Sequence, residues 1–141
     1  MMRTLVLDAG AFIAAERWDR HFTELIAAAT AEGAAILIPA PVIAEVWRTP
    51  SRPRSKTVVE LVDEIIALDA VLARRVGALI GIAGSTQIVD GSVAQIAIQA
   101  KPSIVVTADP ADIASLLKAA GEPYGLGLAA KVKAQILIER V

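Results

Sequence analysis

The stretch Ile104-Val105-Val106-Thr107-Ala108-Asp109 begins with three apolar β-branched residues and ends in an aspartate. A shorter run of the same kind, Leu5-Val6-Leu7-Asp8, stands near the start of the chain. Neither run alternates apolar with polar residues, which is typical of parallel strands covered by helices on both faces. Ligands of an open parallel sheet bind just beyond the carboxyl ends of its strands. The two aspartates are therefore expected to share one crevice.

Five runs have this strand-like character, and stretches with helical spacing of apolar residues separate them. Such alternation predicts an α/β protein, a three-layer α/β/α domain with right-handed crossovers and a central, mostly parallel sheet of about five strands. At 141 residues the chain has the size of one domain, so residues 1–141 are expected to form a single one. The expected strands are Thr4 to Leu7, Ala35 to Ile38, Glu64 to Leu68, Ile104 to Thr107 and Ala134 to Ile138.

Local signals indicate where several helices begin and end. Asp69 is expected to cap a helix that runs through Ile82 and ends at Gly84, because aspartate favours the N-cap and glycine the position after the last turn. Apolar residues at helical spacing predict a second helix from His21 to Ala31. Shorter helices are expected over residues 11–16, over 92–100 and from about Pro110.

Composition narrows the classes of protein that the chain can represent. The sequence is 55% hydrophobic, yet no uninterrupted apolar stretch approaches the roughly 18 to 20 residues of a membrane span. The first residues lead directly into a strand, which favours a cytoplasmic protein. A formal net charge of −1 gives no overall positive field for nucleic acid. Because the chain has no cysteine and only one histidine, His21, any metal should be held by oxygen.

Four acidic side chains lie within apolar runs or at their ends: Asp8, Glu45, Asp90 and Asp109. Two carboxylates about 4 Å apart repel each other by roughly 4 kcal/mol at an effective dielectric constant near 20. A divalent cation is the usual means of holding such a cluster together. The pattern therefore predicts a metal site, with Thr107 placed to donate a hydrogen bond to a neighbouring carboxylate or a bound water.

Each acid also has an ordinary structural explanation, and these explanations stay open at the level of sequence. An aspartate before a helix often only accepts a hydrogen bond from the first backbone N–H groups. A glutamate in an apolar helix needs a partner, because burying an unpaired carboxylate is costly. Capping applies to Asp8, Asp90, Asp109 and Asp112, and an ion pair with Arg48 or Arg52 applies to Glu45.

A short basic loop follows the segment that carries Glu45. Two prolines, Pro50 and Pro53, interrupt it and exclude a regular helix. Next to a carboxylate cluster, such a loop is expected to contribute to the site, and the alternative is a solvated loop without a binding role. Its basic residues are Arg48, Arg52, Arg54 and Lys56.

Across essentially its whole length the chain resembles a PIN-domain ribonuclease of the VapC toxin type, the nuclease half of a bacterial toxin–antitoxin pair. The resemblance rests on the order and spacing of four motifs: LVLDAGAFIA at 5–14, VIAEV at 42–46, IVDGSVA at 88–94 and VVTADPAD at 105–112. One departure follows the first acid, where many relatives carry Ser, Thr or Asn and this chain has Ala9 and Gly10. One hydrogen bond beside that acid is therefore expected to be absent.

The resemblance implies an activity, a cofactor and partners. Asp8 and Asp90 would be the primary ligands of Mg²⁺, or of Mn²⁺ in its place, with Glu45 and Asp109 completing the site and Asp112 as a further acid. RNA would be hydrolysed to a 5′-phosphate and a 3′-hydroxyl. Similar proteins form homodimers and are silenced by a cognate antitoxin. An antitoxin helix is expected in an apolar groove along the first two helices, formed by Phe12, Ile13, Trp18, Phe22, Leu25 and Ile26.

Two other functions compete with this one. A PIN-like module could bind RNA or a partner without cutting. A receiver-like phosphoacceptor domain also has aspartates at strand ends, but it normally has two adjacent acids after its first strand and a lysine after its last. Here Asp8 stands alone, and the run from Ile104 ends in Asp109.

Overall fold

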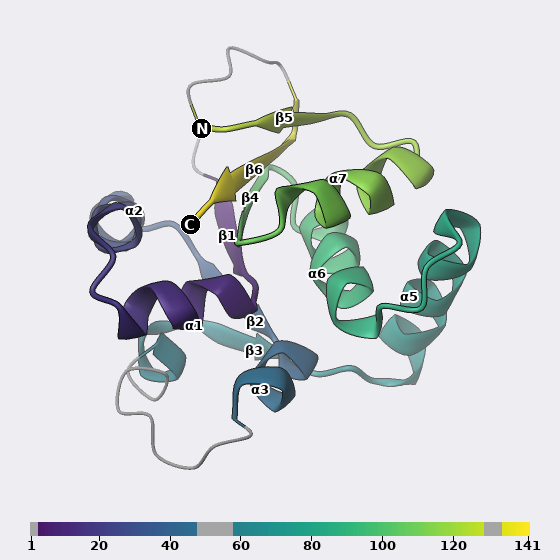
Figure 1. Cartoon of the computed structure of the whole chain (residues 1–141), viewed down its shortest axis with the longest axis horizontal. Helices are drawn as coiled ribbons and strands as arrows, with labels where there is room; N and C mark the ends of the chain where they lie inside the picture. The colour runs from purple at the N-terminus through teal and green to yellow at the C-terminus, as the bar shows by residue number, and fades with distance from the viewer. Residues whose placement is uncertain (1–2, 48–57, 129–133) are drawn as a thin grey trace.

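The computed structural model describes residues 3–47, 58–128 and 134–141. Within these ranges the chain forms one six-stranded sheet in the order β3-β2-β1-β4-β6-β5, and every neighbouring pair is parallel (Figure 1). The basic loop with Arg48, Arg52, Arg54 and Lys56 lies outside the described residues. The strands are β1 Thr4–Leu7, β2 Ile36–Pro39, β3 Glu64–Ile66, β4 Ser103–Thr107, β5 Tyr124–Leu126 and β6 Ile136–Arg140.

Helices cover both faces of this sheet, so the three-layer α/β/α architecture is confirmed. In Figure 1, α1 and α2 lie on one side of the strands, and α5, α6 and α7 lie on the other. The described helices are α1 Ala9–Glu16, α2 Arg20–Glu32, α3 Ala40–Val46, α5 Ala70–Ala83, α6 Ile88–Gln99 and α7 Pro110–Ala119. No single one of them is long and apolar enough to cross a membrane, although α5 and α6, bent by 108° at the break between them, reach that length and composition as a pair.

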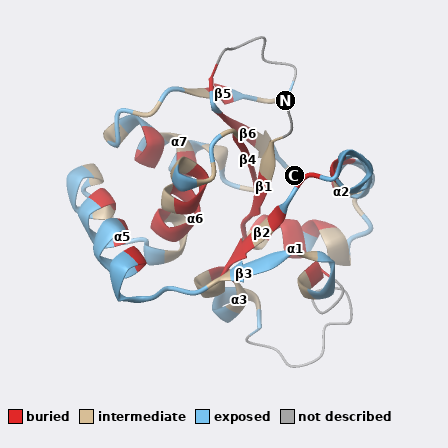
Figure 2. Ribbon diagram, turned by 180° about the vertical axis from the view of Figure 1, so that it is seen from behind, coloured by how far each residue is buried: buried red, intermediate tan, exposed pale blue. Residues whose placement is uncertain are grey.

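The two central strands, β1 and β4, form the core of the sheet. Val6 is paired with Val105, and both are fully buried. Figure 2 shows this burial continuing along neighbouring strands. Strands with both faces covered need apolar residues at successive positions, which explains the two runs that stood out in the sequence.

The sheet has one strand more than the sequence indicated. β5 was missed because it has three residues, one of them Gly125, and pairs only with β6 at the sheet edge. β6 begins at Ile136, not Ala134, and extends to Arg140, because Glu139 and Arg140 pair with Val106 and Thr107 of β4. Apolar pattern alone does not reveal polar residues that take part in a strand through backbone pairing.

Helix ends follow the local signals at α5 and depart from them at α6. Asp69 caps α5 by accepting a hydrogen bond from the Leu72 N–H, and Gly84 ends it with a φ of 68°. α6 begins at Ile88, four residues before the expected start, and Gln87 at its N-cap makes no side-chain capping bond within the described residues. Asp90 consequently lies inside the first turn, so the alternative explanation, that Asp90 only caps this helix, is wrong.

The apolar groove expected along α1 and α2 does not have the form that the sequence suggested. Phe12, Phe22 and Leu25 are at most 8% exposed and belong to the core. Ile26 also packs against that core. Phe12 and Phe22 are therefore unavailable to a docked helix. Leu25 still lines a small pocket, and Ile26 is only partly buried. Ile13 and Trp18 are exposed, at 44% and 75%.

Candidate metal centre

The crevice at the carboxyl ends of β1 and β4 is the topological switch point of the sheet. β2 and β3 lie on one side of β1, whereas β4, β6 and β5 lie on the other. Connections therefore leave in opposite directions from this point, which is where open α/β sheets bind ligands. Asp8 directly follows β1, and Thr107 is the last residue of β4.

Asp8 is held in place by a hydrogen bond to each of its carboxylate oxygens. The Ala9 backbone N–H donates to Oδ1 at 2.7 Å, and the Thr107 hydroxyl donates to Oδ2 at 2.7 Å. Thr107 Oγ1 in turn accepts from the backbone N–H of Asp109 at 3.0 Å. Asp8 is 6% exposed and Thr107 is fully buried. The expected bond from Thr107 to a carboxylate is confirmed, and a backbone group at Ala9 supplies the other bond.

Gly10 explains how α1 comes so close to the turn between β4 and α7. A Cβ atom at this position would lie 2.5 Å from the Ala108 nitrogen and 2.8 Å from the Ala108 Cβ. Real Cβ atoms do not approach backbone so closely, so only glycine allows this contact. The close approach places the start of α1 against the residue between Thr107 and Asp109.

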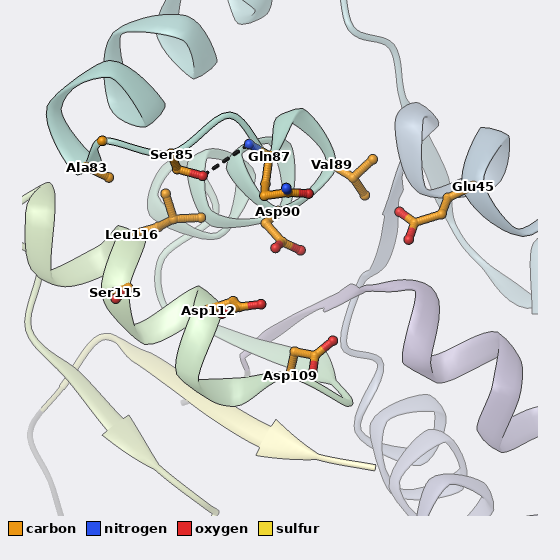
Figure 3. A pocket seen from close by; sticks show the side chains of 11 residues that line it. Glu45, Ala83, Ser85, Gln87, Val89, Asp90, Asp109, Asp112, Ser115 and Leu116 are labelled. Atoms are coloured by element: carbon orange, nitrogen blue, oxygen red, sulfur yellow. Dashed lines mark hydrogen bonds between the residues drawn. The ribbon is translucent and has the colours of Figure 1, made fainter.

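Four carboxylates from three helices line one pocket of about 620 Å³ (Figure 3). Glu45 comes from α3, and Asp90 from the first turn of α6. Asp109 immediately precedes α7, and Asp112 lies in its first turn. In Figure 3 the side chains of Asp90, Asp112 and Asp109 lie one below another near the middle, and Glu45 points toward them from the right.

Burial and neighbouring charges raise the pKa values of two acids, Asp8 and Asp90. Burial, followed by the charges of the other four acids, raises the pKa of Asp90 to about 6. Burial is also the largest cause that raises the pKa of Asp8, against hydrogen bonds that lower it. Asp8 does not line the pocket. Of the four neighbouring charges, however, that of Asp8 contributes most to raising the pKa of Asp90. The five acids, Asp8, Glu45, Asp90, Asp109 and Asp112, therefore act within one electrostatic field.

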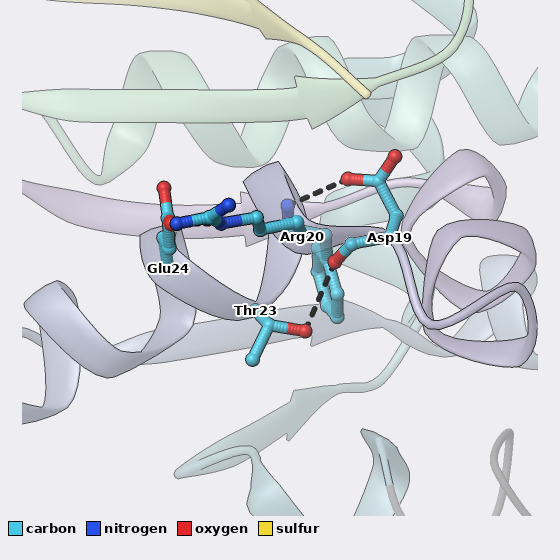
Figure 4. Close-up of polar contacts among 5 residues, drawn as sticks. Asp19, Arg20, Thr23 and Glu24 are labelled. Carbon is cyan, nitrogen blue, oxygen red and sulfur yellow. Dashed lines mark hydrogen bonds and ion pairs between the residues drawn. The ribbon is translucent and has the colours of Figure 1, made fainter.

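No ion pair between described residues neutralises the charge of these five acids. Those that join described residues are Arg20 with Glu24, His21 with Glu139 and Lys101 with Glu122, and none includes an acid of the cluster. Figure 4 shows the first of them on α2, where Arg20 Nε lies 2.8 Å from Glu24 Oε1. The alternative ion pair of Glu45 with Arg48 or Arg52 falls on residues outside the described ranges.

Helix capping accounts for one acid of the cluster. Asp8 occupies the N-cap of α1 and accepts from Ala9, as the structural explanation required. Asp109 occupies the N-cap of α7, but its side chain makes no capping bond within the described part of the chain. Asp90 and Asp112 lie inside first turns. Capping is therefore the wrong explanation for these three aspartates.

Acids that influence each other's pKa values need not be close enough to coordinate one metal ion. Across residues 3–47, 58–128 and 134–141, no group of three or more His, Cys, Asp or Glu side chains has the spacing of a metal site. Glu45, Asp90, Asp109 and Asp112 share a pocket, and the charge of Asp8 acts on Asp90 from outside it. Among the described residues, however, no three of these side chains converge as metal ligands do.

Sequence reasoning missed the uncharged residues that complete the pocket. Ser85 and Gln87 come from the turn between α5 and α6, and Ser115 lies on α7 one turn after Asp112. Serine and glutamine on exposed turns and helices are ordinary surface residues, so the sequence held no signal for them. The remaining lining residues are Ala83, Gly84, Val89 and Leu116.

Comparison with known proteins identifies a similar fold but no similar sequence family. No family model matches the sequence, and no curated protein matches it. The structure is similar to the crystal structure of PAE2754 from Pyrobaculum aerophilum, with a TM-score of 0.56 and 21% identity over 86% of this chain and 100% of that chain. At this identity the similarity concerns the fold alone: the chain shares a parallel α/β architecture with that protein.

Proposed function

We propose that this protein is a Mg²⁺-dependent endoribonuclease of the PIN-domain, VapC toxin type. The observation that carries the proposal is the gathering of five carboxylates at the switch point of the sheet, with no ion pair to any of them among the described residues. The resemblance of the four motifs to that family supplies the reaction class.

The charge of the cluster favours a divalent cation. With a pKa of about 6, Asp90 is mostly ionised at neutral pH and adds to the charge of its neighbours. The charges of the other four acids raise the pKa of Asp90, so their repulsion is felt within the cluster, and a bound cation would relieve it. Mg²⁺ and Mn²⁺ prefer oxygen ligands, and every candidate ligand here is a carboxylate. The donor set therefore fits these ions.

The roles of the residues follow from the resemblance to the PIN-domain family. Asp8 and Asp90 would be the primary ligands, and Glu45 and Asp109 would complete the site directly or through water. Thr107 and the Ala9 N–H orient the Asp8 carboxylate, and Asp112 adds negative charge beside Asp90. When bound, the metal lowers the pKa of a water and neutralises charge on the phosphate under attack. Products with a 5′-phosphate and a 3′-hydroxyl are expected.

The two competing functions are less well supported. Retention of all four acidic positions favours cleavage over binding alone. A receiver-like domain normally has two adjacent acids after its first strand, whereas Asp8 stands alone after β1. The receiver-like alternative is therefore disfavoured.

RNA, a second copy of the chain and an antitoxin are the partners in this proposal. The basic loop, Arg48, Arg52, Arg54 and Lys56, would contact RNA phosphates. Ile13 on α1 and Trp47 after α3 are each 44% exposed and offer apolar area for a protein partner. Co-purification from the native operon tests for the antitoxin, and polar substitution of Ile13 and Trp47 tests whether this surface binds it.

The central test is cleavage of a structured RNA by the purified protein with Mg²⁺ or with EDTA. Wild-type protein should cut only with the metal, and Asp90→Asn should not cut. Asp69→Asn is the matched control, since it makes the same chemical change at an exposed helix cap where asparagine serves equally well. Equal cutting by Asp90→Asn at saturating Mg²⁺ would contradict the metal site. Metal-independent RNA binding without cutting would support the binding module.

A further inference from the structure

The pocket that holds the acids has two chemically different ends. Glu45, Asp90, Asp109 and Asp112 form the acidic end. Ser85 and Ser115, with Leu116 beside them, form what we call the uncharged end, and the Gln87 side chain lies beside Asp90 where the two ends meet. In Figure 3, Ser85, Leu116 and Ser115 lie on the side of Asp90 and Asp112 that faces away from Glu45. A ligand bound at the acids would thus have a second wall to contact.

The volume of the pocket exceeds what a metal ion requires. Six waters around one ion occupy roughly 180 Å³, taking about 30 Å³ for each water. The pocket measures about 620 Å³, which lies within the usual range for binding an organic ligand. Most of the space therefore remains for a substrate group beside the ion.

Polar groups at the uncharged end are available for hydrogen bonding. Ser85 Oγ accepts from the Gln87 backbone N–H at 3.1 Å, which fixes the turn that leads into α6. The Gln87 side-chain amide and the Ser115 hydroxyl make no hydrogen bond to any described residue. Gln87 offers two donors and one acceptor, and Ser115 offers one donor and two lone pairs. Leu116 is 3% exposed and adds an apolar residue to the lining of the pocket.

The kind of ligand follows from the absence of positive charge. Among the described residues that line this pocket there is no lysine or arginine, so the uncharged end has nothing that favours a second phosphate. Amides and hydroxyls instead match the edges of bases and the ribose 2′-hydroxyl, and single-stranded RNA exposes both. We propose that Gln87 and Ser115 form a subsite for the base and ribose of one unpaired nucleotide adjacent to the cleaved phosphate. The identity of this ligand rests on the ribonuclease function proposed above.

The test compares Gln87→Ala and Ser115→Ala with the wild-type protein on a pool of unstructured RNA with random sequence. Gln99→Ala is the matched control, because Gln99 is exposed at the far end of the same helix. New 5′ ends are sequenced to find which nucleotides flank the cut. Loss of one net hydrogen bond should lower the preference for the favoured nucleotide by roughly three- to tenfold, with KM raised and kcat little changed. Gln99→Ala should keep the wild-type preference.

A second measurement separates this inference from the ribonuclease proposal. Asp90→Asn protein, with and without Gln87→Ala, is titrated against a fluorescent RNA from the same pool. If the wild-type protein cuts and both alanine variants keep its flanking preference, the subsite is wrong and the ribonuclease stands. If the wild-type protein does not cut, the ribonuclease is wrong, and the titration decides the subsite: weaker binding after Gln87→Ala supports it, and equal binding overturns it.

Discussion

Two helices of this protein begin in the same way, and their aspartates nevertheless do different things. Asp8 before α1 and Asp69 before α5 both have extended backbones, with ψ of 177° and 178°. Asp69 is exposed and accepts one hydrogen bond, from the Leu72 N–H. Asp8 is buried, and its second oxygen accepts from Thr107, a residue 99 positions away in the sequence. An aspartate at a helix cap can therefore have a second role. Whether it does depends on what its second carboxylate oxygen contacts in the folded protein.

The largest expected difference between the two caps concerns RNA cleavage. Asp8→Asn removes a proposed metal ligand, so Mg²⁺-dependent cleavage should fall by at least about 100-fold, since even residues that only support ligands often cost 10- to 100-fold. Asp69→Asn keeps its cap and should cut at the wild-type rate. Rates are measured at saturating Mg²⁺, with folding checked by the melting temperature. Similar rates for the two variants would show that both aspartates are only caps.

Substituting alanine for a glycine should destabilise the protein in α1 and stabilise it in α5. Gly10→Ala places a Cβ against the Ala108 backbone at 2.5 Å, and we expect a loss of about 3 kcal/mol in the free energy of unfolding. Gly77→Ala makes the same change in α5, where the added Cβ would meet no atom within 4 Å apart from its chain neighbours and the backbone of its own helix. It should stabilise by about 0.5–1 kcal/mol through helix propensity. Urea denaturation measures both. A stable Gly10→Ala protein would mean that α1 can move away from Ala108 without cost.

Thr107→Val tests the bond that distinguishes Asp8 from Asp69. The variant keeps the shape of the side chain but leaves Asp8 Oδ2 and the Asp109 N–H without their partner. We expect a loss of about 2 kcal/mol in the free energy of unfolding, as is usual for a buried group left unsatisfied. Because the Thr107 bond lowers the pKa of Asp8, that pKa should rise further. Unchanged stability would indicate that water replaces the hydroxyl.

The smallest effect is on how stability depends on pH without metal. The pKa of Asp90 is raised to about 6 in the folded protein, so its protonation favours folding. The stability that it contributes is present below its unfolded pKa, near 4, and is lost as pH rises through about 6. In EDTA, wild-type protein should therefore lose more stability than Asp90→Asn over this window. Asp90 is half-exposed, and parallel curves would show that solvent screens its field entirely.

Features that depend on a few neighbouring residues were readable from the sequence. The cap at Asp69 and the end of its helix at Gly84 are both confirmed, because a helix end is determined within about one turn. The runs that form β1 and β4 were evident because central parallel strands need apolar residues on both faces. The rule that ligands bind at strand ends then indicated that Asp8 and Asp109 would lie close together.

Features that depend on distant partners were decided by the tertiary structure. β5 and the polar end of β6 exist through backbone pairing, which leaves no mark on side-chain pattern. Phe12, Phe22 and Leu25 resembled a free apolar surface until the sheet was placed beneath them. The sequence did not identify Gln87 and Ser115 as pocket residues, because glutamine and serine are common at any exposed position. Sequence determines which groups a chain can offer, whereas their neighbours, and therefore their burial and pKa values, are set only when remote segments pack together.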